Sequence, residues 1–127
     1  MDYGSGQRSF INQLKIYDAI YHRYDPGIPD ISKMPIEHGD FIICTEVMEH
    51  VPEIDIDAVL SRIKGLSENI FFSINCKLSG EIFTNGLNAH CSIFDAYWWL
   101  DKVKKHWPEA TMIYPKNDRD WETLYSA

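Results

Sequence analysis

The feature that most constrains the fold is an uninterrupted apolar run near the middle of the chain. In "DFIICTEV", residues 40–47, four apolar residues in succession lead into polar ones. A strand that is apolar on both faces is typical of a parallel sheet covered on both sides. A second run of this kind, "NIFFSINC", covers residues 69–76. The sequence therefore predicts two fully buried strands.

The segment between these two runs is predicted to form a helix. In "PEIDIDAVLSRIKGL", residues 52–66, Pro52 stands in the first turn, acidic residues come early and basic residues come late. This distribution suits the helix dipole and the rigid backbone of proline. The apolar residues at helical spacing form an inner stripe, which consists of Val59, Leu60, Ile63 and Leu66.

The flanking segments continue the alternation of strands and helices. The turn "DYGSGQ" precedes a helix in "SFINQLKIYD", with Ser9 as its N-cap, and a short strand in "AIYHRYDP". The segment "GIPDISKMPIEHG" is expected to be a loop with at most a short strand near Ile31. A helix in "IFDAYWWLDKVKKHW" places Trp99, Val103 and Trp107 on one face. Two final strands, "ATMIYP" and "WETLYSA", would pair as a hairpin through "KNDRD".

This order predicts one α/β domain over residues 1–127, with a mostly parallel sheet and helices on both faces. The net charge of −7 argues against a broad nucleic-acid interface, which needs clustered Lys and Arg. The three cysteines are far apart and include no Cys-x-x-Cys, so neither a disulfide framework nor a zinc ribbon is expected. No apolar run approaches the ~18 residues of a membrane span. The N-terminus has no signal-peptide core, so we expect a cytoplasmic protein without membrane contact.

Four polar stretches are predicted to meet at one edge of the sheet. "DYGSG", "YDP", "CTEVMEH" and "INCKLSG" all fall at carboxyl ends of expected strands, where α/β proteins bind ligands. The Gly-x-Gly of the first stretch allows close backbone approach to a ligand. Asp25 lies 19 residues after Gly6, at the spacing of a carboxylate that accepts ribose hydroxyls. The alternative is that Asp25 only forms an Asp-Pro-Gly turn.

The stretch "CTEVMEH" carries Glu46, Glu49 and His50 at positions i, i+3 and i+4. On a helical turn these positions share a face, and two carboxylates and an imidazole would suit Mg²⁺ or Mn²⁺. His90 follows the next strand, so a parallel sheet would bring it to the same edge. Two alternatives stay open. His50 or His90 would act as a general base without metal, or the stretch is only the polar start of a helix.

Taken together, "DYGSG", "YDP", "DFIICTEVMEHVP" and "NIFFSIN" resemble, in order, the motifs of class I S-adenosylmethionine-dependent methyltransferases. The stretch "NGLNAHCSIFDAYWWLDKV" is similar to one in small bacterial and phage methyltransferase-like proteins. The resemblance covers nearly the whole chain. It implies a Rossmann-like fold with a C-terminal antiparallel hairpin and S-adenosylmethionine as cofactor. By position it places Asp2, Gly4 and Gly6 near the methionine half, Asp25 at the ribose, and Cys44 and Thr45 beside the sulfonium.

The chain departs from this family at its beginning. Only "MDY" remains of the family's central first strand, so we expect an N-terminally truncated form with two open edges in mid-sheet. Either the sequence is a fragment of a longer gene, or the sheet closes differently, or another chain fills the gap. The segment between Asp25 and Asp40 is also short, so the family's third strand must be minimal.

The Glu-x-x-Glu-His spacing is similar to that of ubiquinone-pathway O-methyltransferases and small-RNA 2′-O-methyltransferases. The second resemblance implies a metal held by Glu46, Glu49, His50 and His90. We therefore expect O-methylation of a small-molecule hydroxyl, assisted by Mg²⁺ or Mn²⁺. The alternatives are a non-catalytic or partial subunit that acts by interaction, as a homo-oligomer or with a partner chain on the open edge, and an RNA 2′-O-methyltransferase.

Overall fold

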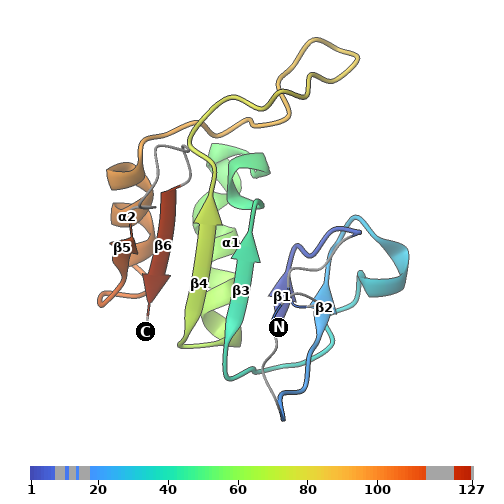
Figure 1. Ribbon diagram of the computed structural model, residues 1–127, viewed down its shortest axis with the longest axis vertical. Coiled ribbons are helices and arrows are strands. Elements are labelled where there is room, and N and C mark those ends of the chain that lie inside the picture. The colour runs from blue at the N-terminus through green and yellow to red at the C-terminus, as the bar shows by residue number, and fades with distance from the viewer. Residues whose placement is uncertain (8–10, 12–13, 15–17, 114–121, 127) are drawn as a thin grey trace.

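The structure is a computed structural model, and it describes residues 1–7, 11, 14, 18–113 and 122–126. Its centre is a sheet in the order β2-β1-β3-β4-β6-β5 (Figure 1). The strands are β1 (Asp2–Tyr3), β2 (Arg23–Tyr24), β3 (Ile42–Thr45), β4 (Ile70–Ile74), β5 (Thr111–Ile113) and β6 (Glu122–Ser126). The first four run parallel, and β6 runs antiparallel to both β4 and β5. The chain therefore folds as an α/β sheet, and the segment between β5 and β6 lies outside the described residues.

The two-residue strand β1 closes the middle of the sheet. Asp2 pairs with Arg23 of β2 on one side and with Ile43 of β3 on the other. The ladder extends one residue further, because the Ile43 amide donates to the Met1 carbonyl at 2.8 Å. The expectation of two open edges is therefore wrong at the level of Asp2 and Tyr3, where the sheet is continuous.

The two described α-helices pack into one core with the strands. Helix α1 (Glu53–Leu66) buries Ile56, Leu60, Ile63 and Leu66. Helix α2 (Ala96–Lys104) buries Trp99 and Val103, and Trp107 follows within the same cluster. These side chains pack with Ile42, Cys44, Ile70 and Phe72 of β3 and β4. Figure 1 shows α1 running behind β3 and β4.

The boundaries and packing of the helices agree closely with the sequence, with small corrections. Pro52 is the N-cap of α1 rather than a residue of its first turn, and Val59 is only partly buried, while Ile56 is fully buried. Asp95 caps α2 by accepting from the Trp98 amide at 3.0 Å. Lys102 of α2 pairs with Asp57 of α1 at 2.7 Å and so joins the two helices.

Two predictions in the first third of the chain meet different outcomes. The segment after Gly27 is mostly loop, as expected, and Ile31 belongs to a short 3₁₀ helix, η2 (Pro29–Ile31), rather than to the short strand that the sequence allowed there. Pro29 within this segment lacks the amide that a strand would use. The helix expected after the glycine turn, with Ser9 as its cap, falls largely outside the described residues. Helices on both faces of the sheet therefore stay a prediction.

None of the described helices has the length and apolar character needed to cross a membrane.

Candidate cofactor and metal site

The sheet topology itself marks one place for a ligand. From β1 the chain moves outward to β2 and then returns to the other side of β1 as β3. In open α/β sheets, ligands bind at this reversal, beyond the carboxyl ends of the strands. Here the reversal lies between the glycine loop after β1 and the turn after β3. Gly4 and Val47 touch across it, since a Cβ on Gly4 would lie 2.4 Å from Val47 Cγ2.

The glycine loop, residues 4–6, is held in one conformation by its neighbours. Gly4 and Gly6 both have positive φ, +74° and +56°, which favour glycine. The amides of Gly4 and Ser5 donate to the Tyr24 carbonyl at 2.8 and 3.1 Å. The side chain of Arg23 donates to the Gly6 carbonyl at 2.7 Å and to Ser5 Oγ at 3.3 Å. Arg23 is a residue that sequence reasoning missed, because an arginine in a short strand carries no motif.

Asp25 joins the end of β2 to this loop. One carboxylate oxygen accepts the Gly6 amide at 2.9 Å, and the other accepts the Gly27 amide at 2.8 Å. The bond from the Gly27 amide is the one expected if Asp25 forms an Asp-Pro-Gly turn, which was the alternative. The first brings Asp25 to the Gly-x-Gly loop, as the spacing of the motif implied. Its role at a ribose stays a prediction, and each oxygen retains a second lone pair.

The other residues assigned to the cofactor differ in burial. Asp2 is buried in β1, at 1% exposure, beneath the glycine loop. Cys44 is fully buried in the core, and burial raises the pKa of its thiol well above the ordinary value, with the charges of Glu49 and Asp2 adding to the rise. Thr45, at the end of β3, is half-buried. Of the two residues expected beside the sulfonium, Thr45 is therefore the nearer to the surface.

Glu49, His50 and His90 form a cluster next to this edge. One ligand atom from each of the three lies within 4.8 Å of the others. Glu49 and His50 belong to a 3₁₀ helix, η3 (Met48–His50), directly after β3. The His50 and His90 rings meet edge to face, with centroids 4.8 Å apart. The structure thus brings together three of the four residues expected to hold a metal, including His90 from 40 residues downstream.

The loop that carries His90 is tied to η3 by its backbone. The Glu49 carbonyl accepts the amides of Cys91 and Ser92 at 2.9 and 3.1 Å. Ser92 is fully buried, and its hydroxyl donates to the Val51 carbonyl at 2.6 Å. These bonds explain why His90 reaches the cluster, although it follows a loop that extends far from the sheet (Figure 1).

Hydrogen bonds orient both imidazoles in the same way. His50 Nδ1 lies 2.8 Å from the Ala89 carbonyl, and His90 Nδ1 lies 2.6 Å from the Lys77 carbonyl. A carbonyl only accepts, so each Nδ1 carries the hydrogen. The lone pair of each ring is then on Nε2, the arrangement found in histidines that bind metals.

Glu49 is a buried carboxylate with an unsatisfied atom. The residue has no exposed surface, and its Oε1 accepts the Asn75 amide at 3.1 Å, while Oε2 is buried without a hydrogen-bond partner. Burial raises the pKa of Glu49, and bonds from backbone amides oppose the rise. A buried carboxylate oxygen without a donor is costly, and a cation or a proton would satisfy it.

Glu46 lies beside this cluster but outside the group of three. It precedes η3, and its φ of +56° is in the left-handed region. The expectation that Glu46, Glu49 and His50 share one helical turn is therefore wrong, because the helical geometry begins only at Met48. Ser73 Oγ donates to Glu46 Oε1 at 3.3 Å. Burial of the carboxyl raises the pKa of Glu46 to about 7, together with the charge of Glu49. Solvent reaches the residue, which is exposed overall.

Comparison with known proteins finds only a partial similarity to solved structures. No family model and no curated protein matches the sequence. Among solved structures, the N-terminal domain of EvdMO1 with SAH and D-fucose is similar, with a TM-score of 0.45 and 14% identity. The match covers 71% of this chain and 46% of that one. The same domain with SAH alone gives a TM-score of 0.44 and 15% identity, over 69% of this chain and 44% of that one. The chain thus spans less than half the length of these structures.

Proposed function

We propose that this chain is a metal-assisted S-adenosylmethionine-dependent methyltransferase that acts on the hydroxyl of a small molecule. One observation carries the proposal. The Gly4–Gly6 loop and the cluster of Glu49, His50 and His90 lie at the same edge of the sheet: the loop follows β1 at the topological reversal, and Glu49 and His50 follow β3. The first is suited to a nucleotide-like cofactor, and the second is suited to an acceptor oxygen.

The residues after β1 and β2 would hold the cofactor. The amides and positive-φ turns of Gly4 and Gly6 allow its polar groups to approach the backbone, and Asp25 would accept ribose hydroxyls. Arg23 would act indirectly, because its bond to the Gly6 carbonyl holds the loop in place.

The donor set of the cluster fits a divalent cation. Two Nε2 lone pairs and one carboxylate suit Mn²⁺ better than Mg²⁺, which prefers oxygen ligands. A bound cation would lower the pKa of an acceptor hydroxyl and orient its oxygen. S-adenosylmethionine, when bound, would supply its methyl group to this oxygen and leave as the neutral thioether product, with the electron pair of the broken carbon–sulfur bond on sulfur.

The proton of the hydroxyl needs an acceptor, and Glu46 is suited to this role. If both imidazole nitrogens bind the cation, neither takes up the proton. A carboxyl with a pKa near neutrality is effective as a general base, and burial next to Glu49 raises the pKa of Glu46 to about 7. In a metal-free form, Nε2 of His50 or His90 would take the proton instead.

Isothermal titration tests the cofactor. We expect S-adenosylmethionine and its demethylated product to bind at one site, and Arg23→Ala to weaken both by roughly tenfold, the equivalent of about 1.4 kcal/mol. Lys104→Ala, which removes a positive charge at the exposed end of α2, should leave binding unchanged. A folded sample that binds neither compound, with or without Mn²⁺, excludes the methyltransferase function.

Thermal unfolding tests the metal separately. We expect Mn²⁺ to raise the melting temperature, since a cation that binds only the native state stabilises it. Glu49→Gln should abolish the rise, and Glu46→Gln should keep it but slow methyl transfer. His38→Ala is the matched control, because His38 is exposed and lies outside the cluster. An equal rise in Glu49→Gln and the wild type removes the metal from the proposal.

A non-catalytic role is the second candidate, and one observation favours it. Both carboxylate oxygens of Asp25 already accept backbone amides, from Gly6 and Gly27. In a protein that acts only by interaction, Asp25 would serve only to hold the backbone at Gly6 and Gly27 in place. In that case Asp25→Asn would lower stability without changing any affinity for S-adenosylmethionine.

A further inference from the structure

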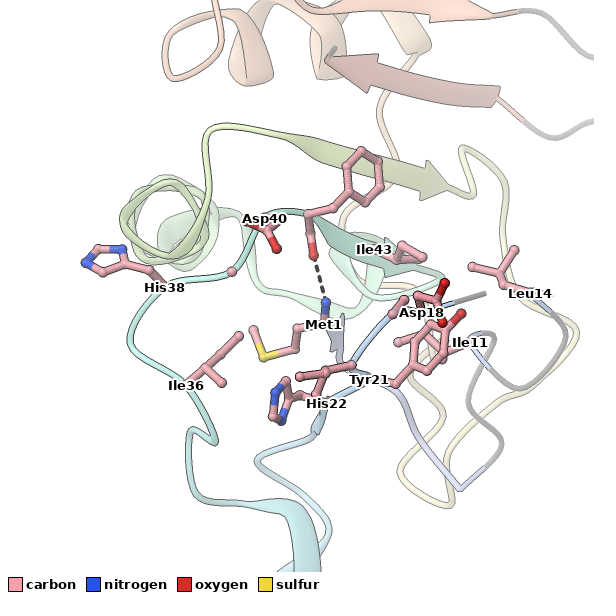
Figure 2. Close-up of a pocket in the computed structure, with 14 residues that line it drawn as sticks. Met1, Ile11, Leu14, Asp18, Tyr21, His22, Ile36, His38, Asp40 and Ile43 are labelled. Carbon is pink, nitrogen blue, oxygen red and sulfur yellow. Dashed lines mark hydrogen bonds between the residues drawn. The ribbon is translucent and has the colours of Figure 1, made fainter. Parts of the chain in front are cut away.

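Exposed large apolar side chains gather in two places. One is a pocket of about 590 Å³ at the amino ends of the strands, which Ile20 and Phe41 help to line (Figure 2). The other is the loop between β4 and α2, which projects beyond the carboxyl ends of the strands (Figure 1). We call residues 78–89 of this loop the arm. Four apolar side chains of the arm are between 57% and 70% exposed: Leu78, Ile82, Phe83 and Leu87.

The arm is a β-hairpin that is held by its own hydrogen bonds. The Phe83 amide donates to the Leu87 carbonyl at 2.8 Å, and the Gly86 amide donates to the Phe83 carbonyl at 2.9 Å and closes the turn. At the base, the Asn88 side chain donates to the Ser79 carbonyl at 2.8 Å and accepts the Ser79 amide at 3.0 Å. A backbone of defined shape therefore presents the apolar side chains of the arm.

The arm is anchored at the candidate metal site. The carbonyl of Lys77, just before the arm, lies 2.6 Å from His90 Nδ1, and the carbonyl of Ala89 lies 2.8 Å from His50 Nδ1. A surface that is ordered before it binds loses less conformational entropy on association. Residues 80–87 are nevertheless all exposed, and two strands that stand alone are only marginally stable in water. Addition of further strands would therefore stabilise the arm.

One edge of the arm presents backbone groups to such strands. Ile82 faces Asn88 across the hairpin as an antiparallel pair. The bonds between the two strands come from the neighbouring residues, through the amides of Phe83 and Ala89. In an antiparallel pair of this kind the two facing residues exchange no hydrogen bond with each other, so the amide and the carbonyl of Ile82 point outward. A further strand can add at this Ile82 edge.

The charges of the chain leave the arm as the place where two copies can meet. Each copy has a net charge of −7, so most of its surface repels a second copy. Within the arm the only charged residue is Glu81. The arm also projects from the body of the molecule, so two arms can pair while the acidic bodies stay apart and salt screens their repulsion (Figure 1).

We propose that the arm pairs two copies of this chain, each adding its Ile82 edge to the other to form one continuous antiparallel sheet. An edge that pairs with its own copy about a two-fold axis is complementary by symmetry. The Ile82 amide of each chain would donate to the Ile82 carbonyl of the other, and the two isoleucine side chains would lie next to each other. The two Phe83 rings would lie diagonally across the new pair of strands, within reach of each other.

The opposite edge of the arm is less suited to this pairing. Its central residue is Asn88, and asparagine is depleted in strands, whereas isoleucine is enriched. The Asn88 side chain is also engaged with Ser79 at the base of the arm. Pairing at the Ile82 edge alone closes the assembly at a dimer, whereas pairing at both edges would continue into longer oligomers.

Sedimentation equilibrium of the whole chain, from about 1 to about 300 µM, tests the dimer. We expect an equilibrium of monomer and dimer that shifts toward dimer as salt is raised, because the acidic bodies repel each other. Ile82→Pro removes the outward amide and keeps the bonds within the hairpin, so it should weaken association by roughly tenfold or more, whereas Ile82→Val should preserve it. Ile54→Pro is the matched control, because Ile54 is 89% exposed in the first turn of α1, where proline is tolerated.

Cysteine cross-linking with diamide tests the register, in a Cys91→Ser background that removes the exposed native thiol. Ile82→Cys should form disulfide-linked dimers, since facing residues that exchange hydrogen bonds have Cα atoms about 5.5 Å apart, within the span of a disulfide. Thr84→Cys should not, because the pairing places its two copies several residues apart. A cross-link specific to position 82 supports the pairing even where the dimer is too weak to sediment.

Three results overturn the proposal. One is a monomer at every concentration together with no cross-link specific to position 82. Another is a dimer that Ile82→Pro leaves intact or that salt dissociates, which would be held by a charged surface elsewhere. The third is assembly beyond the dimer, which would require the Asn88 edge as well.

Discussion

The two ends of the same parallel strands are built in opposite ways. At the carboxyl ends, polar side chains and backbone groups bond one another closely, as His50 does with Ala89 and Ser92 with Val51. At the amino ends, Ile20 and Phe41 are exposed around a pocket. The comparison teaches that polar groups at the carboxyl ends mostly bond one another, apart from Glu49 Oε2, whereas apolar side chains at the amino ends are exposed to solvent. Substitutions at the carboxyl ends should therefore cost more than matched substitutions at the amino ends.

The largest difference in stability between the two ends of the strands is expected when a glycine at each end is replaced by alanine, which adds a methyl group. In Gly4→Ala the new Cβ would lie 2.4 Å from Val47 Cγ2, on a backbone with φ of +74°. We expect a loss of about 2 to 4 kcal/mol in the free energy of unfolding, because overpacking and backbone strain add. In Gly39→Ala, at the amino ends, the Cβ would meet the flexible tip of Ile36 at 3.0 Å and the Phe41 carbonyl at an ordinary 4.0 Å.

Urea denaturation of both variants measures this difference. Gly6→Ala serves as a further control, since Gly6 shares the positive φ of Gly4 but has no atom within 4 Å of a Cβ. It should lie between the other two. Equal stability of the Gly4 and Gly39 variants would show that the carboxyl ends of the strands are no more closely packed than the amino ends.

A smaller difference is expected for the loss of one polar contact. Ser92→Ala removes the hydroxyl that donates to the Val51 carbonyl and should cost about 1 to 2 kcal/mol, because a buried carbonyl loses its donor. It should also weaken the Mn²⁺ response, since Ser92 lies two residues after His90. Ile20→Asp at the amino ends should change the free energy of unfolding by no more than about 0.5 kcal/mol, because Ile20 is exposed. Thermal unfolding with and without Mn²⁺ checks both, and an unchanged response in Ser92→Ala would separate the loop from the cluster.

Much of the sheet and its helices was predictable, because burial on both faces leaves a clear pattern. The apolar runs around Ile43 and Phe72 gave β3 and β4, and the spacing of Leu60 and Ile63 gave α1. The approach of His90 to Glu49 and His50 followed from parallel strands, whose carboxyl ends share one edge. These features depend on periodicity and topology alone.

The remaining features depend on backbone conformations and contacts that no pattern encodes. Glu46 has spacing typical of a helical face, but its left-handed φ places it before the helix. Arg23 supports the glycine loop by donating to the Gly6 carbonyl and to Ser5 Oγ. Because these partners are far from Arg23 in the sequence, the residues next to Arg23 show no pattern that would predict the bonds. The break at the start of the sheet was expected, but the two residues of β1 close it, because Asp2 pairs with both β2 and β3.

The smallest effect is expected for the titration of Glu46, because solvent screens the charge of this exposed residue, and its sign distinguishes the two ends of the strands. Its pKa is about 7 in the folded protein, above the ordinary 4.5, so between these values the native state binds more protons than the unfolded state. Without metal, the free energy of unfolding should therefore fall as the pH rises from about 4.5 to about 7. Glu46→Gln should flatten this fall, whereas Ile20→Ala at the amino ends, which changes no titratable group, should not. Denaturation between pH 5 and pH 7.5 measures the slopes, and a wild type whose stability rises over this range would contradict the crowding of Glu46 against Glu49.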